Sequence, residues 1–137
     1  MITAVDTNVL LDVFTGDPVH GARSREALGD CLHAGPVFAC EVVWAEVAAA
    51  FADARAAQAA MVSADVTFTP MSPDAAGRAG EAWRAYRTRG GTRDRLVADF
   101  LIGAHATTSA DRLLTRDRGF YRSYFAGLEV FDPSTSP

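Results

Sequence analysis

The sequence predicts an α/β domain, a three-layer α/β/α sandwich in which helices cover both faces of a mainly parallel five-stranded sheet. Short apolar or β-branched runs typical of strands alternate with longer segments of helical composition. Parallel neighbours need crossover connections, which are right-handed and place helices on both faces. A chain of 137 residues can build one hydrophobic core. We therefore expect a single domain over residues 1–133 and a frayed tail at 134–137.

Each predicted element has a local signal. Strands are expected where apolar or β-branched residues run together, at residues 2–5, 36–39, 66–69, 113–115 and 128–131. Helices are expected between them, at residues 9–14, 19–32, 41–60, 72–88 and 95–107. Pro18 and Pro73 suit the first turn of a helix, and Gly90 ends one. Residues 41–60 form either one helix or two that meet near Ala52.

The composition excludes several classes of protein. All 13 cationic residues are arginines, which excludes chemistry that needs a lysine amine, such as Schiff-base catalysis or a P-loop phosphate site. Cys31 and Cys40 lack the spacing of a zinc site and are expected to be free thiols. The start has no basic signal-peptide region, and no apolar stretch reaches the roughly 18 residues of a membrane span. We therefore expect a cytoplasmic protein with no membrane partner.

Charge is distributed unevenly along the chain. Residues 1–69 hold 3 arginines and 9 acids, a net −6, whereas residues 70–137 hold 10 arginines and 8 acids, a net +2. The overall charge of −4 does not exclude a polyanionic partner, because arginines that share one surface can still attract it.

Four acidic residues fall where an α/β fold places its ligand crevice, beyond the carboxyl ends of the strands. Asp6 follows the first predicted strand directly, and Asp117 comes two residues after the fourth. Asp99 lies in or near the first turn of an apolar helix. Glu46 has only valine and alanine three and four positions away on either side, which puts its carboxylate on the apolar face of its helix.

Each acid also has an ordinary structural explanation. Asp6 can cap a helix, and Asp99 can complement a helix dipole from the first turn. Glu46 can pair with an arginine, and Asp117 can be a turn residue. None of these explains why strand ends and an apolar face all present acids. Carboxylates that share a crevice repel one another unless a divalent cation lies among them, and oxygen ligands favour Mg²⁺ or Mn²⁺.

The same stretches resemble the PIN-domain family and, within it, the VapC-like toxins of toxin–antitoxin pairs. The family's opening strand with its Asp-Thr-Asn is matched by VDTN at residues 5–8, and its helical glutamate by WAEV at 44–47. Its third acid heads DFLIGAHA at 99–106, and the fourth ends LTRD at 114–117. The order and spacing of these four pieces make the resemblance specific.

The resemblance implies a PIN-like fold and a metal-dependent endoribonuclease that is the toxin of a VapBC-type pair. The partners it implies are an RNA substrate, a cognate VapB-like antitoxin and a second copy of the chain in a homodimer. We expect Asp6 and Asp99 to be the primary ligands of Mg²⁺ or Mn²⁺, with Glu46 and Asp117 completing the catalytic site. A catalytically inactive PIN-like module that binds RNA or protein is the alternative.

Further residues are expected at the same crevice. Thr7, Asn8 and Thr115 can hold the carboxylates or waters by hydrogen bonds, with turn or cap roles as the alternative. Four arginines are candidates for binding the RNA backbone, with a solvated basic face as the alternative. They are Arg112, Arg116, Arg118 and Arg122.

Overall fold

The computed structural model describes residues 1–91 and 97–135 of the chain. Within these ranges five strands form one sheet in the order β3-β2-β1-β4-β5, and all neighbouring strands are parallel. The strands are β1 (Thr3–Val5), β2 (Val37–Ala39), β3 (Thr67–Phe68), β4 (Arg112–Leu114) and β5 (Glu129–Phe131). The predicted fold class is therefore confirmed.

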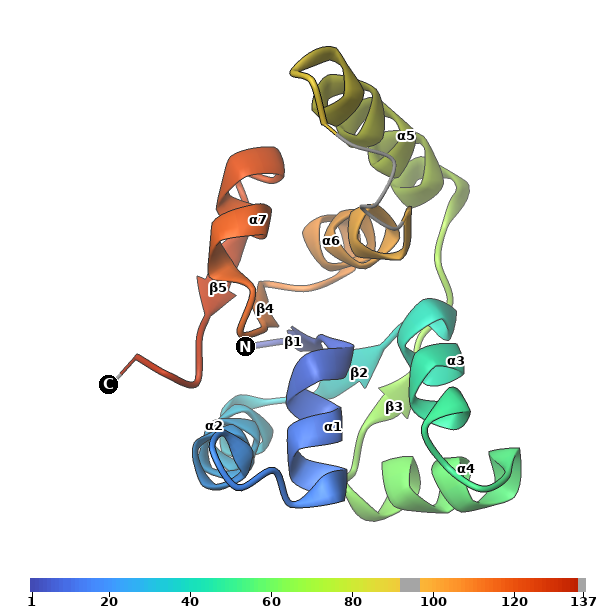
Figure 1. Cartoon of the computed structure of the whole chain (residues 1–137), viewed down its shortest axis with the longest axis vertical. Coiled ribbons are helices and arrows are strands. Elements are labelled where there is room, and N and C mark those ends of the chain that lie inside the picture. The colour runs from blue at the N-terminus through green and yellow to red at the C-terminus, as the bar shows by residue number, and fades with distance from the viewer. Residues whose placement is uncertain (92–96, 136–137) are drawn as a thin grey trace.

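Helices cover both faces of this sheet. The connections from β1 to β3 hold α1 (Thr7–Thr15), α2 (Gly21–Ala34), α3 (Glu41–Ala49) and α4 (Ala54–Ser63). The later connections hold α5 (Pro73–Thr88), α6 (Val97–Ser109) and α7 (Arg118–Tyr124). Figure 1 shows α1 and α2 on one face of the sheet, with α6 and α7 on the other and α5 outside α6. This arrangement is the three-layer sandwich that right-handed crossovers produce.

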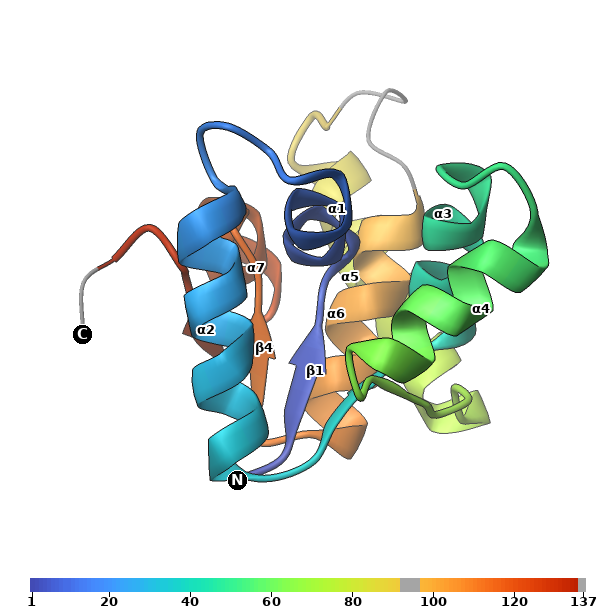
Figure 2. The same cartoon turned by 90° about the horizontal axis from the view of Figure 1, so that it is seen from below.

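The sheet reverses its direction of growth between β1 and β4. From β1 the chain adds β2 and β3 on one side, and it then returns to add β4 and β5 on the other. Figure 2 shows β1 beside β4 from the side of α2 and α4. The backbone N–H of Asp6 donates to the carbonyl of Leu114 over 2.9 Å, so the two strands end together. Ligand crevices of open parallel sheets lie at this switch point.

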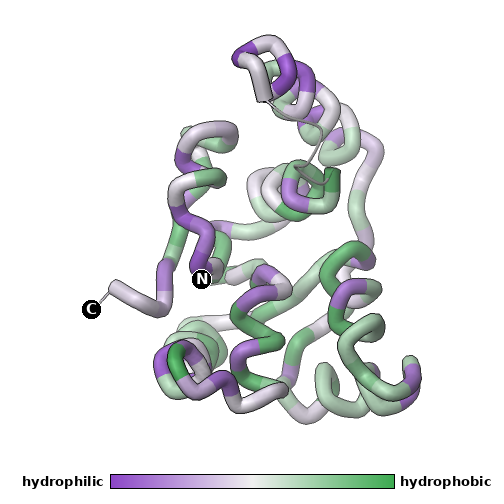
Figure 3. The backbone as a smooth tube through the Cα atoms, in the orientation of Figure 1, coloured by the Kyte–Doolittle hydropathy of each residue, from purple (hydrophilic) through white to green (hydrophobic). Residues whose placement is uncertain are grey.

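The apolar pattern of the chain follows these layers. In Figure 3 hydrophobic positions gather along α1, α3 and α6, whereas hydrophilic positions are frequent along α5 and α7. Helix α6 is buried almost continuously from Phe100 to Ala106, because the sheet lies on one side of it and α5 on the other. This double burial explains why its sequence is apolar all round and not amphipathic.

The structure decides between the two arrangements expected for residues 41–60 and adds one helix that was not expected. Residues 41–60 fold as two helices, and the break at residues 50–53 confirms one of the two expected arrangements. Helix α7 was not predicted, because a seven-residue helix containing Gly119 has little local signal. The predicted start of the sixth helix at Arg95 lies outside the described residues. None of the helices within the described ranges is long and apolar enough to cross a membrane.

Candidate functional site

Asp6 is a buried carboxylate held entirely by neutral donors. It follows β1 directly, its exposed fraction is 4%, and it caps the N-terminus of α1 by accepting the backbone N–H of Thr7 at Oδ1 over 2.7 Å. Its Oδ2 accepts the hydroxyl of Thr115 over 2.8 Å, the phenol of Tyr121 over 3.1 Å and the amide of Asn8 over 3.4 Å. Asp6 therefore does cap a helix, as its ordinary structural explanation predicts, but the cap uses only Oδ1 and not Oδ2.

The surroundings of Asp6 disfavour its ionised form. The pKa of this carboxyl is raised to about 6, mainly by burial and in addition by the negative charge of Asp99, although the hydrogen bonds from Thr115, Thr7 and Tyr121 act to lower it. Every hydrogen-bond donor to Asp6 within the described ranges is neutral. A carboxylate in this position is stabilised by binding either a proton or a metal cation.

Asp99 and Asp117 lie close enough to act on the same group. Burial is the main reason that the pKa of Tyr121 is well above its usual range, and the charges of Asp6, Asp99 and Asp117 add to the effect. The phenol therefore stays protonated and remains a donor to Asp6. The charges of three of the four predicted acids thus act on one phenol, although these acids follow β1, lie in the first turn of α6 and precede α7.

Thr115 and Asn8 connect Asp117 to Asp6. The hydroxyl of Thr115 donates to Asp6 and accepts the backbone N–H of Asp117 over 3.0 Å and the amide of Asn8 over 3.4 Å. The side-chain oxygen of Asn8 accepts the backbone N–H of Arg116 over 3.2 Å. These bonds fix the loop after β4 against the start of α1, as expected of residues that hold the site.

Glu46 reaches this network through Thr7. The hydroxyl of Thr7 donates to Oε1 of Glu46 over 2.7 Å, while the backbone N–H of Thr7 donates to Asp6. Glu46 is half-buried on α3, and within the described part of the chain it forms no ion pair with an arginine. The structure therefore gives no support to the alternative in which an arginine pairs with Glu46.

The donor set suits a hard divalent cation more than zinc. Within residues 1–91 and 97–135, no three acidic, histidine or cysteine side chains are grouped as a complete metal site. Mg²⁺, however, is usually held by one or two carboxylates and keeps several of its waters. Asp6 and Asp99 fit such an ion, since their oxygens are the hard ligands it prefers and their mutual repulsion favours a cation between them.

The predicted arginines are mostly engaged elsewhere. Arg112 begins β4 at the opposite end of the sheet, where it donates to Thr3 over 3.0 Å and lies 5.0 Å over the ring of Phe131. Its predicted place beside the acids was therefore wrong, because strand polarity puts the first residue of β4 far from the crevice. Arg116 and Arg118 lie nearer the site but are paired with acids. Arg122 is exposed on α7.

Arg116 forms a two-point ion pair that the sequence did not reveal. Its guanidinium donates to Asp12 from Nε over 2.6 Å and from Nη2 over 3.0 Å. Asp12 is buried on α1 and also accepts the hydroxyl of Ser24 over 2.7 Å. Arg118 approaches the buried Asp132 at 3.9 Å in a similar pair. Long-range partners of this kind leave no local pattern in a sequence.

Tyr121 is the other site residue that sequence reasoning missed. It is fully buried on α7 and its hydroxyl points into the acid cluster. The only available signal was its position four residues after Asp117, which places it one turn into a helix that begins at that acid.

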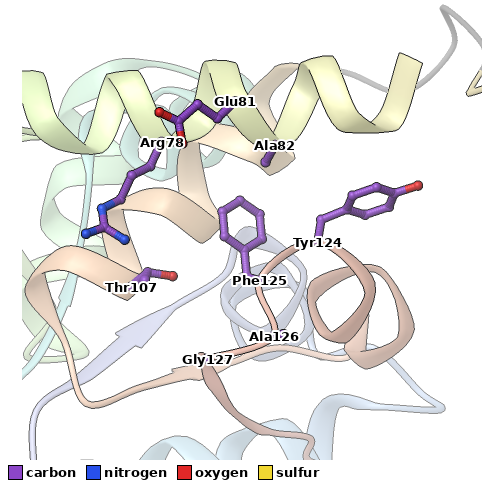
Figure 4. Close-up of a pocket in the computed structure, with 8 residues that line it drawn as sticks. All are labelled: Arg78, Glu81, Ala82, Thr107, Tyr124, Phe125, Ala126 and Gly127. Atoms are coloured by element: carbon purple, nitrogen blue, oxygen red, sulfur yellow. The ribbon is translucent and has the colours of Figure 1, made fainter. Parts of the chain in front are cut away.

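One cavity within the described ranges is lined by none of these acids. Its volume is about 400 Å³, and it opens between α5, α6 and α7. Figure 4 shows Arg78 and Tyr124 at its two ends. The lining residues are Arg78, Glu81, Ala82, Thr107, Tyr124, Phe125, Ala126 and Gly127.

Several solved structures have a fold similar to that of this chain. Solved structures that share the fold include a chain of VapBC-1 from nontypeable Haemophilus influenzae, with a TM-score of 0.73 and 15% identity over 98% of this chain and 100% of that one. A chain of DNA-bound VapBC from Salmonella typhimurium gives 0.72 and 15% over 97% and 98%. VapC20 of Mycobacterium tuberculosis, described as a toxin that cleaves the sarcin–ricin loop, gives 0.61 and 18% over 93% and 98%.

The sequence itself carries the family assignment. No curated protein matches the chain in sequence. The profile of the PIN domain, however, matches residues 3–126, which include all four predicted acids and Tyr121. The match spans most of the chain, and the solved structures named above have the same fold. The chain therefore belongs to the PIN-domain family.

Proposed function

We propose that this protein is a metal-dependent endoribonuclease that hydrolyses RNA phosphodiester bonds with Mg²⁺ or Mn²⁺. The observation that carries the proposal is the buried Asp6, whose hydrogen-bond donors among the described residues are all neutral and whose pKa is raised by burial and by the charge of Asp99. Such an acid is unfavourable as an isolated anion and favourable as a metal ligand. Membership of the PIN-domain family supports the same chemistry.

Some residues of the site hold Asp6 in place, and others bind the metal ion. Thr115 and Tyr121 hold Oδ2 of Asp6, which leaves Oδ1 with a single backbone donor and therefore available to a cation. Asp99 supplies the second ligand. Asp6 and Asp99 would hold a divalent ion, which would supply an acidified water and charge stabilisation for the phosphoryl oxygens.

Glu46 and Asp117 act from the border of this site. The bond from Thr7 orients the Glu46 carboxylate, and the turn after Thr115 positions Asp117. Both can hold coordinated waters or orient the ligands, which is the role that outer residues of metal sites usually have. Arg122, exposed on α7, is the predicted arginine that we retain for contact with the RNA backbone.

We further propose that the chain is the toxin of a VapBC-type pair that acts in the cytoplasm. The support is the likeness in fold to chains of VapBC complexes from Haemophilus influenzae and Salmonella typhimurium. The partners that follow from the proposal are a VapB-like antitoxin and a second copy of the chain.

Cleavage of RNA tests this function directly. Purified wild-type protein, Asp6→Asn and Asp99→Asn are incubated with a mixed RNA pool in Mg²⁺, in Mn²⁺ and in chelator. Cleavage should require the metal and should be lost in both variants. Undiminished cutting in chelator, or by either variant, would overturn the proposed roles. A wild-type protein that binds RNA but never cuts it would favour the inactive binding module instead.

A further inference from the structure

The two halves of α5 carry different charge. The first half holds Asp74, Arg78 and Glu81, and Arg78 is paired with Asp74 at 3.5 Å. From residue 82 to residue 91 there is no acid, and Arg84, Arg87 and Arg89 are all exposed. Trp83 is also exposed, and it shares the face of Arg87, which lies four residues further along the helix. The end of α5 is therefore a cationic and aromatic surface.

Aromatic rings hold two of these arginines in place. The guanidinium carbon of Arg87 lies 5.0 Å from the centre of the Trp83 ring, and that of Arg89 lies 5.6 Å from the Tyr124 ring on α7. Arg122 is exposed on α7, two residues before Tyr124. We call the set formed by Trp83, Arg84, Arg87, Arg89 and Arg122 the α5–α7 arginine face.

A chain of aromatic contacts ties this face to the acids. Tyr86 of α5 packs on Phe100 of α6 at 5.5 Å and on Tyr124 of α7 at 5.6 Å between ring centres. Phe100 directly follows Asp99 and packs on Phe120 at 5.0 Å. Phe120 in turn contacts Tyr121, whose hydroxyl donates to Asp6. These packed rings connect α5 and α7, which carry the arginine face, to Tyr121 and Asp6 of the site.

The positive charge of the α5–α7 arginine face can offset the repulsion between the acids of the site and the phosphates of an RNA. A cluster of acids repels the phosphates of a polyanion, so a nuclease of this kind needs cations next to the acids. Figure 4 shows the cavity that runs along α5, in which Arg78 and Glu81 together bring no net charge. The uncompensated positive charge therefore lies at the end of α5 that carries Arg84, Arg87 and Arg89.

We propose that the α5–α7 arginine face binds single-stranded RNA that flanks the cleaved bond, with the arginines on phosphates and Trp83 stacked on a base. This inference rests on the proposed function and adds to it the path of the substrate. An exposed indole with a guanidinium beside it is the arrangement that binds unpaired bases without sequence preference. Base-paired nucleic acid offers such a ring no free base to stack on.

The affinity for RNA is measured in the absence of metal, so that cleavage cannot affect the result. The probe is a fluorescein-labelled 12-nucleotide oligouridylate, and its anisotropy is followed in chelator at several salt concentrations. R87Q/R89Q is compared with R25Q/R55Q, a matched pair that removes the same charge from exposed positions on α2 and α4. Circular dichroism of each variant checks that it is folded.

We expect R87Q/R89Q to weaken binding about tenfold and to reduce the salt slope by about 1.4, since each phosphate contact on a single strand contributes about 0.7. The control pair should leave the slope unchanged. W83L should weaken binding by about tenfold with the slope unchanged, because stacking carries no charge. Equal losses in the two arginine pairs, or no loss in R87Q/R89Q, would overturn the inference, as would a preference for duplex DNA of equal length.

The outcome also separates this inference from the proposed nuclease. If R87Q/R89Q loses RNA binding but the wild-type protein never cleaves RNA, the binding face stands and the catalytic proposal fails. If the wild-type protein cleaves RNA and R87Q/R89Q binds as well as it does, the catalytic proposal stands and the binding face is overturned.

Discussion

Asp6 and Asp12 are two equally buried acids, six residues apart, in opposite electrostatic situations. Their exposed fractions are 4% and 5%. Asp12 accepts two bonds from the guanidinium of Arg116 and one from Ser24. Asp6 accepts only neutral donors within the described structure, and burial raises its pKa to about 6.

The difference distinguishes a buried acid with a structural role, which is paired with a cation, from a buried acid that is available to bind one. The negative charge of Asp12 is already matched by Arg116, so it ties the loop after β4 to α1 and has little need of another cation. The charge of Asp6 is oriented by hydroxyls but not matched, and a second acid, Asp99, acts on it. This is the combination that marks candidate functional sites.

The largest effect is expected from replacing each of the two acids by its amide. Asp6→Asn should lower RNA cleavage about a thousandfold, because the charge stabilisation that a metal supplies is worth several kcal/mol. Its folding stability should stay the same or rise. Asp12→Asn should keep near-normal cleavage but should lower the free energy of unfolding by about 2 kcal/mol. The loss is not larger because Arg116 is partly exposed and can be solvated without its partner. Urea unfolding and a cleavage assay on both variants measure the contrast, and equal profiles would contradict it.

The pH dependence of stability should follow Asp6 in the metal-free chain. Its pKa is about 6 in the folded state against an ordinary value of 3.8, so the folded chain keeps a proton that the unfolded chain loses. Stability from this group is therefore present below about pH 4 and falls as the pH rises through 6, by about 3 kcal/mol. Urea unfolding in chelator from pH 4 to 7 measures the fall. Asp6→Asn should abolish it, and a wild-type curve no steeper than that of the variant would count against an unmatched Asp6.

A smaller effect is expected at Tyr121, which helps to orient Asp6. Tyr121→Phe removes the 3.1 Å bond to Oδ2 and keeps the buried ring. Cleavage should fall about tenfold, since a residue that orients a ligand is typically worth 10- to 100-fold. Stability should change by about 1 kcal/mol. The pKa of Asp6, followed by NMR, should rise in this variant, and an unchanged pKa together with full activity would remove Tyr121 from the site.

The smallest change in cleavage is expected at Arg116, the partner of Asp12. Arg116→Gln should leave cleavage within about twofold of wild type, while stability falls by about 3 kcal/mol because the buried carboxylate of Asp12 loses its cationic partner. Arg122→Gln is the matched comparison, since Arg122 is exposed and has the same charge. A larger loss of cleavage in Arg116→Gln than in Arg122→Gln would mean that Arg116 binds RNA and does not only match Asp12.

The sequence allowed Asp6 to be found because its signal is local. A short apolar strand that ends in an acid, followed by a helix, can be read from six residues, and the parallel sheet then places that acid at a crevice. The role of Arg116 could not be read, because its partner Asp12 lies 104 positions away. Tyr121 was hidden for a related reason. Helix α7 is short, and its N-terminal residue Asp117 makes no side-chain capping bond that would mark where it begins.

The prediction that Arg112 lies near the acids was wrong because the direction of its strand was not taken into account. A charged residue next to an apolar strand was taken to lie near the strand-end acids, although it stands at the start of β4 and they stand at the carboxyl ends. The direction of β4 puts Arg112 at the end of the strand away from these acids, and no local pattern predicts that its long side chain packs over Phe131.

Metal-linked thermal stability tests most directly whether Asp6 is the unmatched acid that binds a cation. Melting temperatures of the wild type, Asp6→Asn and Asp12→Asn are compared in chelator and in saturating Mn²⁺. At 100 times its dissociation constant, the metal should stabilise the wild-type protein and Asp12→Asn by about 2.7 kcal/mol and leave Asp6→Asn unchanged. An equal rise in melting temperature for Asp6→Asn, or none in the wild type, would contradict a metal site at this aspartate.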